Sequence, residues 1–162
     1  MQANCRVVKN ILWIEVLFYN SELHMKKIIL AIDPGSKKCG IALVDSNLRY
    51  IEGEVVDNEE LVGRVKKYKD KYHPNNIIVG SGTNSEIIIT ILKDNFPEFL
   101  IIPVKEKDTT WQARKYFFQY NPPTGWLKFI PISLLLPPRP YDDFAAYVIA
   151  RRFFTEYQQG KE

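Results

Sequence analysis

At 162 residues, with 46% hydrophobic and 25% charged residues, the chain has the size and composition of one globular domain with one sizeable core. No apolar run reaches the length of a transmembrane helix, and Cys5 and Cys39 lack the spacing of a zinc site or a disulfide framework. The formal net charge of +3 allows a nucleic-acid partner without requiring one.

Residues 1–24 differ from the rest of the chain. The stretch from Ile11 to Tyr19 is apolar and aromatic, but Glu15 interrupts it and no small-residue cleavage site follows, so a signal peptide is a poor match. A clean strand pattern begins only after Met25. Residues 1–24 are therefore either an extension upstream of a natural start at Met25 or an extra element of the domain. The domain itself is expected over 25–162.

The stretch 28–44 predicts a buried strand, a tight polar turn and a second strand. Five consecutive apolar residues, typical of a central strand covered on both faces, end at the carboxylate Asp33. A Pro-Gly pair then breaks the strand, and Gly35 lets a phosphate approach the backbone. Lys37 and Lys38 add positive charge to this turn. The pattern indicates a place for a metal ion and a phosphate, and the alternative is a hairpin whose Asp only caps the turn.

The remaining pattern alternates between strands and helices. After strands at about 26–33 and 39–46, a third strand at 50–56 completes a meander. The later elements expected are a helix at 58–71, a strand at 76–80, a helix at 84–95, a strand at 99–106, a helix at 109–120, a Pro-rich loop at 121–140 and a helix at 141–157. This order predicts an α/β fold with a mixed sheet and helices on both faces. Ligands of such sheets gather at the carboxyl ends of the strands.

Acidic residues fall at these strand ends and at the start of the last helix. Asp33 ends the first strand, Glu106 ends the fifth, and Asp142 and Asp143 begin the helix. Two alanines three and four residues after Asp142 lie on its helical face and would let the helix approach the sheet closely. Converging carboxylates repel unless a cation lies among them, and oxygen ligands favour Mg²⁺ or Mn²⁺. We therefore predict Asp33, Glu106 and Asp142 as catalytic metal ligands, with Asp143 in reserve, although each acid alone also fits a solvated or helix-capping role.

Four segments resemble, in order, the motifs of YqgF/RuvX-type proteins, which belong to the ribonuclease H-like superfamily. They are residues 32–42, the pair Val79-Gly80 with its polar turn, the run Glu106-Lys107-Asp108-Thr109-Thr110 with Ala113, and the run Asp142-Asp143-Phe144-Ala145-Ala146. The third resembles D-E-R-x-T-T-x-x-A and the fourth D-x-x-A-A, and the resemblance covers about residues 25–157. It implies a ribonuclease H-like five-stranded sheet in the order 3-2-1-4-5, with strand 2 antiparallel.

The same resemblance implies a function. It indicates a cytoplasmic, metal-dependent nuclease that matures the 5′ end of 16S ribosomal RNA, and it leaves open a Holliday junction resolvase-like DNA endonuclease. Lys105 and Lys107 stand where the family commonly has Asp and Arg, the turn 81–84 lacks the usual Pro, and the strand at 76–80 carries no acid. These departures keep a third interpretation open, a non-catalytic nucleic-acid-binding module. A phosphotransferase of the sugar-kinase type would need a second domain, for which the chain has no room.

The expected partner is RNA, namely pre-16S rRNA, or structured DNA, bound by a monomer or a homodimer. The residues expected to contact nucleic acid are Gly35, Lys37, Lys38, Thr110, Lys128 and Arg139. If the Pro-rich loop folds over the strand ends, its cations would surround the acidic site. Aromatic residues of such a loop can stack on bases, but we expect Trp126 to pack as a lid on its own domain.

Overall fold

The computed structural model describes residues 27–82, 84–105 and 109–159. Within these ranges, five strands form one sheet in the order β3-β2-β1-β4-β5. The strands are β1 (Ile28–Pro34), β2 (Lys38–Asp45), β3 (Tyr50–Asp57), β4 (Asn76–Gly80) and β5 (Ile101–Val104). The β1–β2 and β2–β3 pairs are antiparallel, whereas the β1–β4 and β4–β5 pairs are parallel. The predicted fold class, strand order and antiparallel second strand are thus confirmed.

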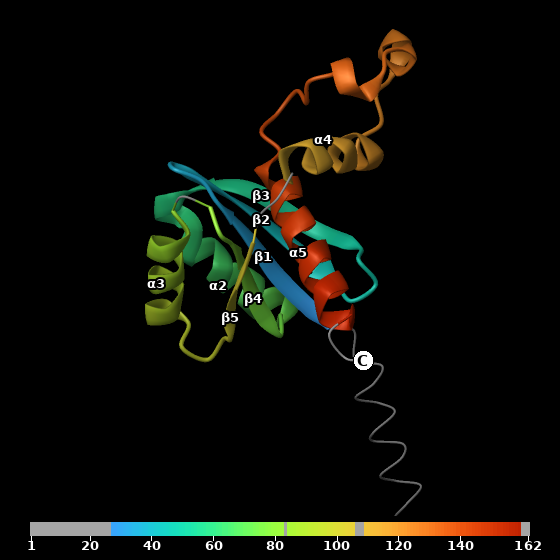
Figure 1. Cartoon of the computed structure of the whole chain (residues 1–162). Helices are drawn as coiled ribbons and strands as arrows, with labels where there is room; N and C mark the ends of the chain where they lie inside the picture. The colour runs from blue at the N-terminus through green and yellow to red at the C-terminus, as the bar shows by residue number, and fades with distance from the viewer. Residues whose placement is uncertain (1–26, 83, 106–108, 160–162) are drawn as a thin grey trace, which may run out of the picture.

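Helices cover both faces of this sheet, as Figure 1 shows. The helical elements are η1 (Asn58–Glu60), α2 (Leu61–Tyr72), α3 (Ser85–Asn95), α4 (Thr109–Tyr120), η2 (Gly125–Phe129), η3 (Ile132–Leu134) and α5 (Asp142–Gln159). Side chains alternate between the two faces along each strand, so Leu30 and Ile32 pack with α2 and α3, whereas Ile29 and Ala31 pack with α5. The continuous apolar run of β1 is buried because both of its faces are covered.

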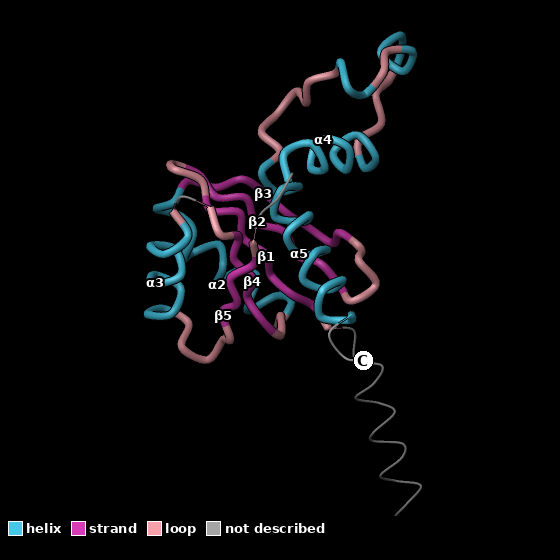
Figure 2. Tube along the Cα trace, in the orientation of Figure 1, coloured by secondary structure: helices cyan, strands magenta, loops and turns pink. Residues whose placement is uncertain are grey.

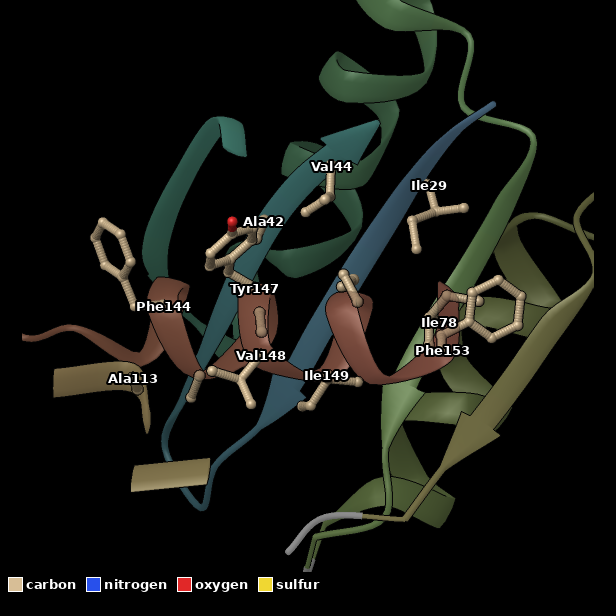
Figure 3. Close-up of a cluster of buried hydrophobic side chains, with 14 of the residues drawn as sticks. Ile29, Ala42, Val44, Ile78, Ala113, Phe144, Tyr147, Val148, Ile149 and Phe153 are labelled. Carbon is tan, nitrogen blue, oxygen red and sulfur yellow. The ribbon is translucent and has the colours of Figure 1, made fainter. Parts of the chain in front are cut away.

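Helix α5 crosses the middle of the sheet and is buried along most of its length. Figure 3 draws Tyr147, Val148 and Ile149 of this helix in one cluster of buried side chains with Ala42 and Ile29 of the strands. All residues from 143 to 150 are buried. Alanines at positions 145, 146 and 150 keep the helix narrow where it meets the strands, so the close approach predicted from the alanine pair is confirmed. None of the helices in the described part of the chain is long and apolar enough to cross a membrane.

The Pro-rich loop differs from the expected lid. Figures 1 and 2 show α4 and the loop after it extending away from the sheet, and the loop contains the two short turns η2 and η3. Trp126 in η2 is 72% exposed, so the prediction that it packs on its own domain is wrong. The loop has the apolar residues that a lid would bury, but no element of the described part of the chain covers them. The expected domain start at Met25 lies outside the described residues and stays a prediction.

Several of the expected elements have bounds that differ by one or two residues, and two elements differ further. The edge strand β5 is shorter than the predicted 99–106, and the predicted helix at 58–71 begins as the separate turn η1. The predicted helix at 109–120 and the strand at 76–80 are confirmed.

Asp45 closes the turn between β2 and β3. Its carboxylate is 1% exposed and accepts hydrogen bonds from the backbone N–H of Asn47 at 2.9 Å and of Arg49 at 3.0 Å. The Arg49 Nε donates to the other oxygen at 2.9 Å. Burial acts to raise the pKa of Asp45, but the hydrogen bonds from Arg49 and Asn47 outweigh it and hold the pKa below its usual value. The ionised carboxylate therefore stabilises this turn.

We expect Asp45→Asn to lower the free energy of unfolding by about 1.5–3 kcal/mol at pH 7, the usual contribution of hydrogen bonds to a charged group. Because the folded pKa is depressed, this stability is present above the unfolded pKa of about 3.9 and is lost as the pH falls through the folded pKa. Urea unfolding of both proteins at pH 7 and pH 3 measures the difference. Asp94→Asn, at an exposed position of α3, is the control, and equal losses in the two variants would contradict the assignment.

Candidate functional site

The carboxyl end of β1 lies beside the first turn of α5. Asp33 of β1 is paired with Gly40 of β2 in the antiparallel register. A Cβ atom on Gly40 would lie 2.0 Å from the backbone carbonyl oxygen of Asp142, so only glycine fits there. Directly opposed residues of an antiparallel pair point to the same face of the sheet. Asp33 and Asp142, which are far apart in the sequence, therefore share one end and one face of the sheet.

The two carboxylates differ in exposure. Asp33 is half-buried at the strand end, whereas Asp142 is exposed in the first turn of α5. Asp142 thus lies at the amino-terminal end of a helix, where negatively charged groups are stabilising. Both residues present carboxylate oxygens, the ligands that Mg²⁺ and Mn²⁺ prefer. Within the described ranges, no three His, Cys, Asp or Glu side chains form a metal-binding group. Glu106, the predicted third ligand, lies outside the described residues.

The turn after Asp33 is held by two asparagines. The Gly35 N–H donates to the Lys38 carbonyl at 3.0 Å, and a Cβ at Gly35 would lie 2.4 Å from that oxygen. The Asn58 side-chain amide donates to the carbonyls of Gly35 at 3.4 Å and Ser36 at 3.3 Å, and the Asn84 amide donates to Gly35 at 3.2 Å. These roles were not predicted from the sequence. The only signal there was that each asparagine stands at the start of a helical element.

The predicted basic residues of the turn are exposed. Lys38 forms an ion pair with Asp57 at 3.7 Å, and both side chains are more than half exposed, so this pair contributes little stability. Lys37 lies at the exposed part of the turn, between Asp33 and β2. The turn therefore offers an exposed cation beside the half-buried carboxylate.

Cys39 does not take part in this surface. It is buried on the opposite face of the sheet among the residues packed against α2, and its thiol lies 3.1 Å from the Asn58 side-chain oxygen. Burial is the main cause that raises the pKa of Cys39 to about 11; a hydrogen bond from Gly35 opposes it, and the negative charge of Asp33 adds to it. A neutral, buried thiol is neither a nucleophile nor a metal ligand at neutral pH.

Asp143 has a different environment from Asp142. It is fully buried, and the guanidinium of Arg139 donates to both of its oxygens, at 3.2 Å and 3.1 Å. The Tyr50 hydroxyl donates to Oδ2 at 2.9 Å. The paired Asp143 raises the pKa of Arg139, whereas burial first and Asp143 second raise the pKa of Tyr50. Asp143 is therefore an anion with both oxygens occupied by protein donors.

These contacts affect the predictions for two site residues, Asp143 and Arg139. Asp143 stays a predicted reserve ligand, but the bonds from Arg139 and Tyr50 argue against that role. Arg139 was predicted to bind nucleic acid, and its guanidinium instead lies between Asp143 and the rings of Phe117 and Phe144, 5.2 Å and 5.9 Å from their centroids. The pairing of Tyr50 with Asp143 joins residues 93 positions apart, and no sequence signal marks it.

Two other predicted contacts belong to α4 and to the loop after it. Thr110 is exposed in the first turn of α4. Lys128 belongs to η2, which Figure 1 shows in the part of the loop farthest from β1. The described structure thus groups Asp33, Gly35, Lys37 and Asp142 at one end of the sheet, and places Lys128 elsewhere.

We expect Asp143→Asn to lower the free energy of unfolding by about 1.5–3 kcal/mol, because the buried side chain loses the charge that accepts the hydrogen bonds from Arg139 and Tyr50. Tyr50→Phe removes one hydrogen bond to a charged group and should cost about 1.5–3 kcal/mol. Asp142→Asn, the same change one residue earlier at an exposed position, is the matched control and should cost less than about 0.5 kcal/mol. Urea unfolding measures all three, and equal midpoints for the two Asn variants would contradict a stabilising role of the Asp143 carboxylate.

Comparison with known proteins shows the same fold in RuvC-type resolvases. The Thermus thermophilus RuvC structure matches with a TM-score of 0.52 and 17% sequence identity, over 83% of this chain and 97% of that one. A Fowlpox virus resolvase, solved with its substrate Holliday junction DNA, matches with a TM-score of 0.52 and 16% identity, over 80% and 99%. No protein-family model and no curated protein matches the sequence. The likeness shows that the chain has the ribonuclease H-like fold of these resolvases.

Proposed function

We propose that the chain is a metal-dependent nuclease that hydrolyses phosphodiester bonds in a structured nucleic acid. One observation carries the proposal: Gly40, the register partner of Asp33, lies against the backbone of Asp142. Two acids that are far apart in the sequence therefore share one face of the sheet at the carboxyl end of the central strand. This is the edge where mixed α/β sheets bind ligands. The likeness to RuvC and the poxvirus resolvase is consistent with this proposal.

The residues present fit a divalent cation by their chemistry. Asp33 and Asp142 would hold it through carboxylate oxygens, and Glu106 is the proposed third ligand. A bound Mg²⁺ or Mn²⁺ would supply stabilisation of negative charge on the phosphodiester and a lower pKa for the attacking water. Asp33 is fixed on a strand covered on both faces, so its position changes little with the substrate. Lys37 would pair with a phosphate oxygen, while Gly35 allows the tight turn that carries it, because the Lys38 carbonyl fills the space of a Cβ there.

Two substrates fit this site. The motif resemblance favours precursor 16S ribosomal RNA, with cleavage at its 5′ end. The structural neighbours favour four-way DNA junctions, because T. thermophilus RuvC and the Fowlpox virus resolvase were both solved with Holliday junction DNA. Lys105, at the end of β5, replaces an acid expected from the motif, and this change supports a non-catalytic binding module as the competing proposal. Cleavage separates the enzyme from the binding module.

We expect Asp33→Asn to lower metal-dependent cleavage by more than about 100-fold, because losing even a residue that supports a metal ligand costs ~10–100-fold. Asn keeps the shape of the side chain, so folding and nucleic-acid binding should persist. Asp142→Asn should have the same effect. The measurement uses purified protein with Mg²⁺ or Mn²⁺ on single-stranded RNA, precursor rRNA and four-way DNA junctions.

Asp70→Asn is the matched control. Asp70 is an exposed carboxylate of α2, which covers the opposite face of the sheet, so its loss should leave the rate unchanged. An Asp33→Asn protein that cleaves at the parent rate with the same metal dependence would place the chemistry elsewhere. If the parent protein binds nucleic acid but cleaves none of the three substrates, the result would support the non-catalytic binding module instead.

A further inference from the structure

Residues 109–139, hereafter the projecting segment, expose large apolar side chains. The segment comprises α4, η2, η3 and the loops that join them, and Figure 1 shows it standing out from the sheet. Its most exposed aromatic residues are Trp111 at 64%, Trp126 at 72% and Phe129 at 83%. Leu134 and Leu136 are also largely exposed. A gathering of exposed apolar residues in one part of a protein marks an interaction site.

The charge of the projecting segment is of one sign. It contains four cations, Arg114, Lys115, Lys128 and Arg139, and no Asp or Glu. Two cations lie beside exposed rings: the Lys115 ammonium is 5.8 Å from the Trp111 ring centroid, and that of Lys128 is 5.9 Å from Phe129. The segment therefore presents aromatic faces next to positive charges, the combination that binds single-stranded nucleic acid by stacking on bases and pairing with phosphates.

Both ends of the projecting segment are fixed to the domain. At one end, Ala113, Phe117 and Phe118 of α4 are buried in the core beneath α5. At the other end, Arg139 is bound to the buried Asp143. The exposed rings are thus presented on a segment with anchored ends, and a surface ordered before binding loses less conformational freedom when a ligand binds.

The charge of the projecting segment also favours nucleic acid over a second copy of this chain as its ligand. A second copy of this chain docked through the same segment would bring two surfaces without acids against each other, and like charges facing each other oppose association. A groove of about 450 Å³ runs between the end of α4 and the loop, lined by prolines and leucines with Arg139, and it has no acidic lining residue. A polyanion with flat apolar groups matches both properties.

We propose that the projecting segment binds unpaired nucleotides, with Trp111, Trp126 and Phe129 stacking on bases and Lys115 and Lys128 pairing with phosphates. The inference that these nucleotides belong to the substrate cleaved at Asp33 and Asp142 rests on the proposed function. Because the segment stands away from the strand ends, it would hold a part of the substrate remote from the cleaved bond. The substrate class is then a nucleic acid that carries a single-stranded region away from the cleaved bond.

The test compares two changes at one exposed position. In Trp126→Phe an aromatic face remains, whereas in Trp126→Leu only apolar surface remains. Binding of the full-length chain to a fluorescent 20-nucleotide single strand is measured by anisotropy in EDTA, so that no cleavage occurs. We expect Trp126→Leu to weaken binding about tenfold, as for the loss of one stacked base, and Trp126→Phe to weaken it less than about threefold. Phe129→Leu should behave like Trp126→Leu.

The proposed phosphate contacts are tested separately, by the dependence of affinity on salt concentration. Lys128→Gln should weaken binding and lower the dependence of affinity on salt by about one counterion, whereas Trp126→Leu should leave that salt dependence unchanged. Ile87→Ala is the control, because Ile87 is also an exposed apolar residue but lies on α3, on the other side of the sheet. It should bind like the parent protein.

Several results would overturn the inference. Equal affinities of the Phe and Leu variants would show that no base stacks on Trp126. A dimer in sedimentation experiments that Trp126→Leu converts to a monomer would show that the surface binds a second copy. The outcome is independent of the cleavage assay: if Asp33→Asn remains active while Trp126→Leu loses binding, the proposed active site is wrong and the binding surface stands.

Discussion

The first turn of α5 can lie directly on β2 because residue 40 has no side chain. The space that a Cβ atom would need is filled by the backbone carbonyl of Asp142, 2.0 Å away. Any larger residue would push the amino-terminal end of the helix off the sheet. The alanines at 145 and 146 continue this close approach along the helix. The position of Asp142 beside the end of β1 therefore depends on the absence of one methyl group in the neighbouring strand.

A second constraint fixes the rotation of α5. Adjacent helical residues point about 100° apart, so Asp142 and Asp143 cannot both face the same surroundings. Asp143 points into the protein, where Arg139 and Tyr50 bind both of its oxygens. Asp142 is consequently the acid that remains exposed at the strand ends. The pairing of the buried Asp143 with Arg139 and Tyr50 thus determines which of two chemically identical neighbours is available to a ligand.

The sequence predicted what depends on local pattern. The uninterrupted apolar run before Asp33 predicted a central strand, because that signal lies within a few residues. The sequence did not predict the Tyr50–Asp143 bond or the two asparagines that hold the Gly35 turn, because these contacts form only after distant elements have packed.

For the candidate site, too, local pattern was predictable from the sequence and contacts between distant elements were not. The sequence placed Asp33 and Asp142 together through a strand end and two alanines, and the register of Asp33 with Gly40 gives a physical reason for that placement. It could not separate the roles of Asp142 and Asp143, because their difference comes from Tyr50 and Arg139. It also expected Trp126 to be covered, since an apolar side chain in a sequence is normally read as buried, whereas the loop that carries it leaves the domain.

The buried carboxylate of Asp143 also joins the projecting segment to the site. Arg139 is the last residue of that segment, and its guanidinium binds the helical turn that carries Asp142. The ring of Phe117, near the other end of the segment, lies against the same guanidinium. Both ends of the segment therefore meet at the first turn of α5. A change in the placement of the segment would therefore act on the orientation of Asp142 through the pairing of Arg139 with the buried Asp143 carboxylate.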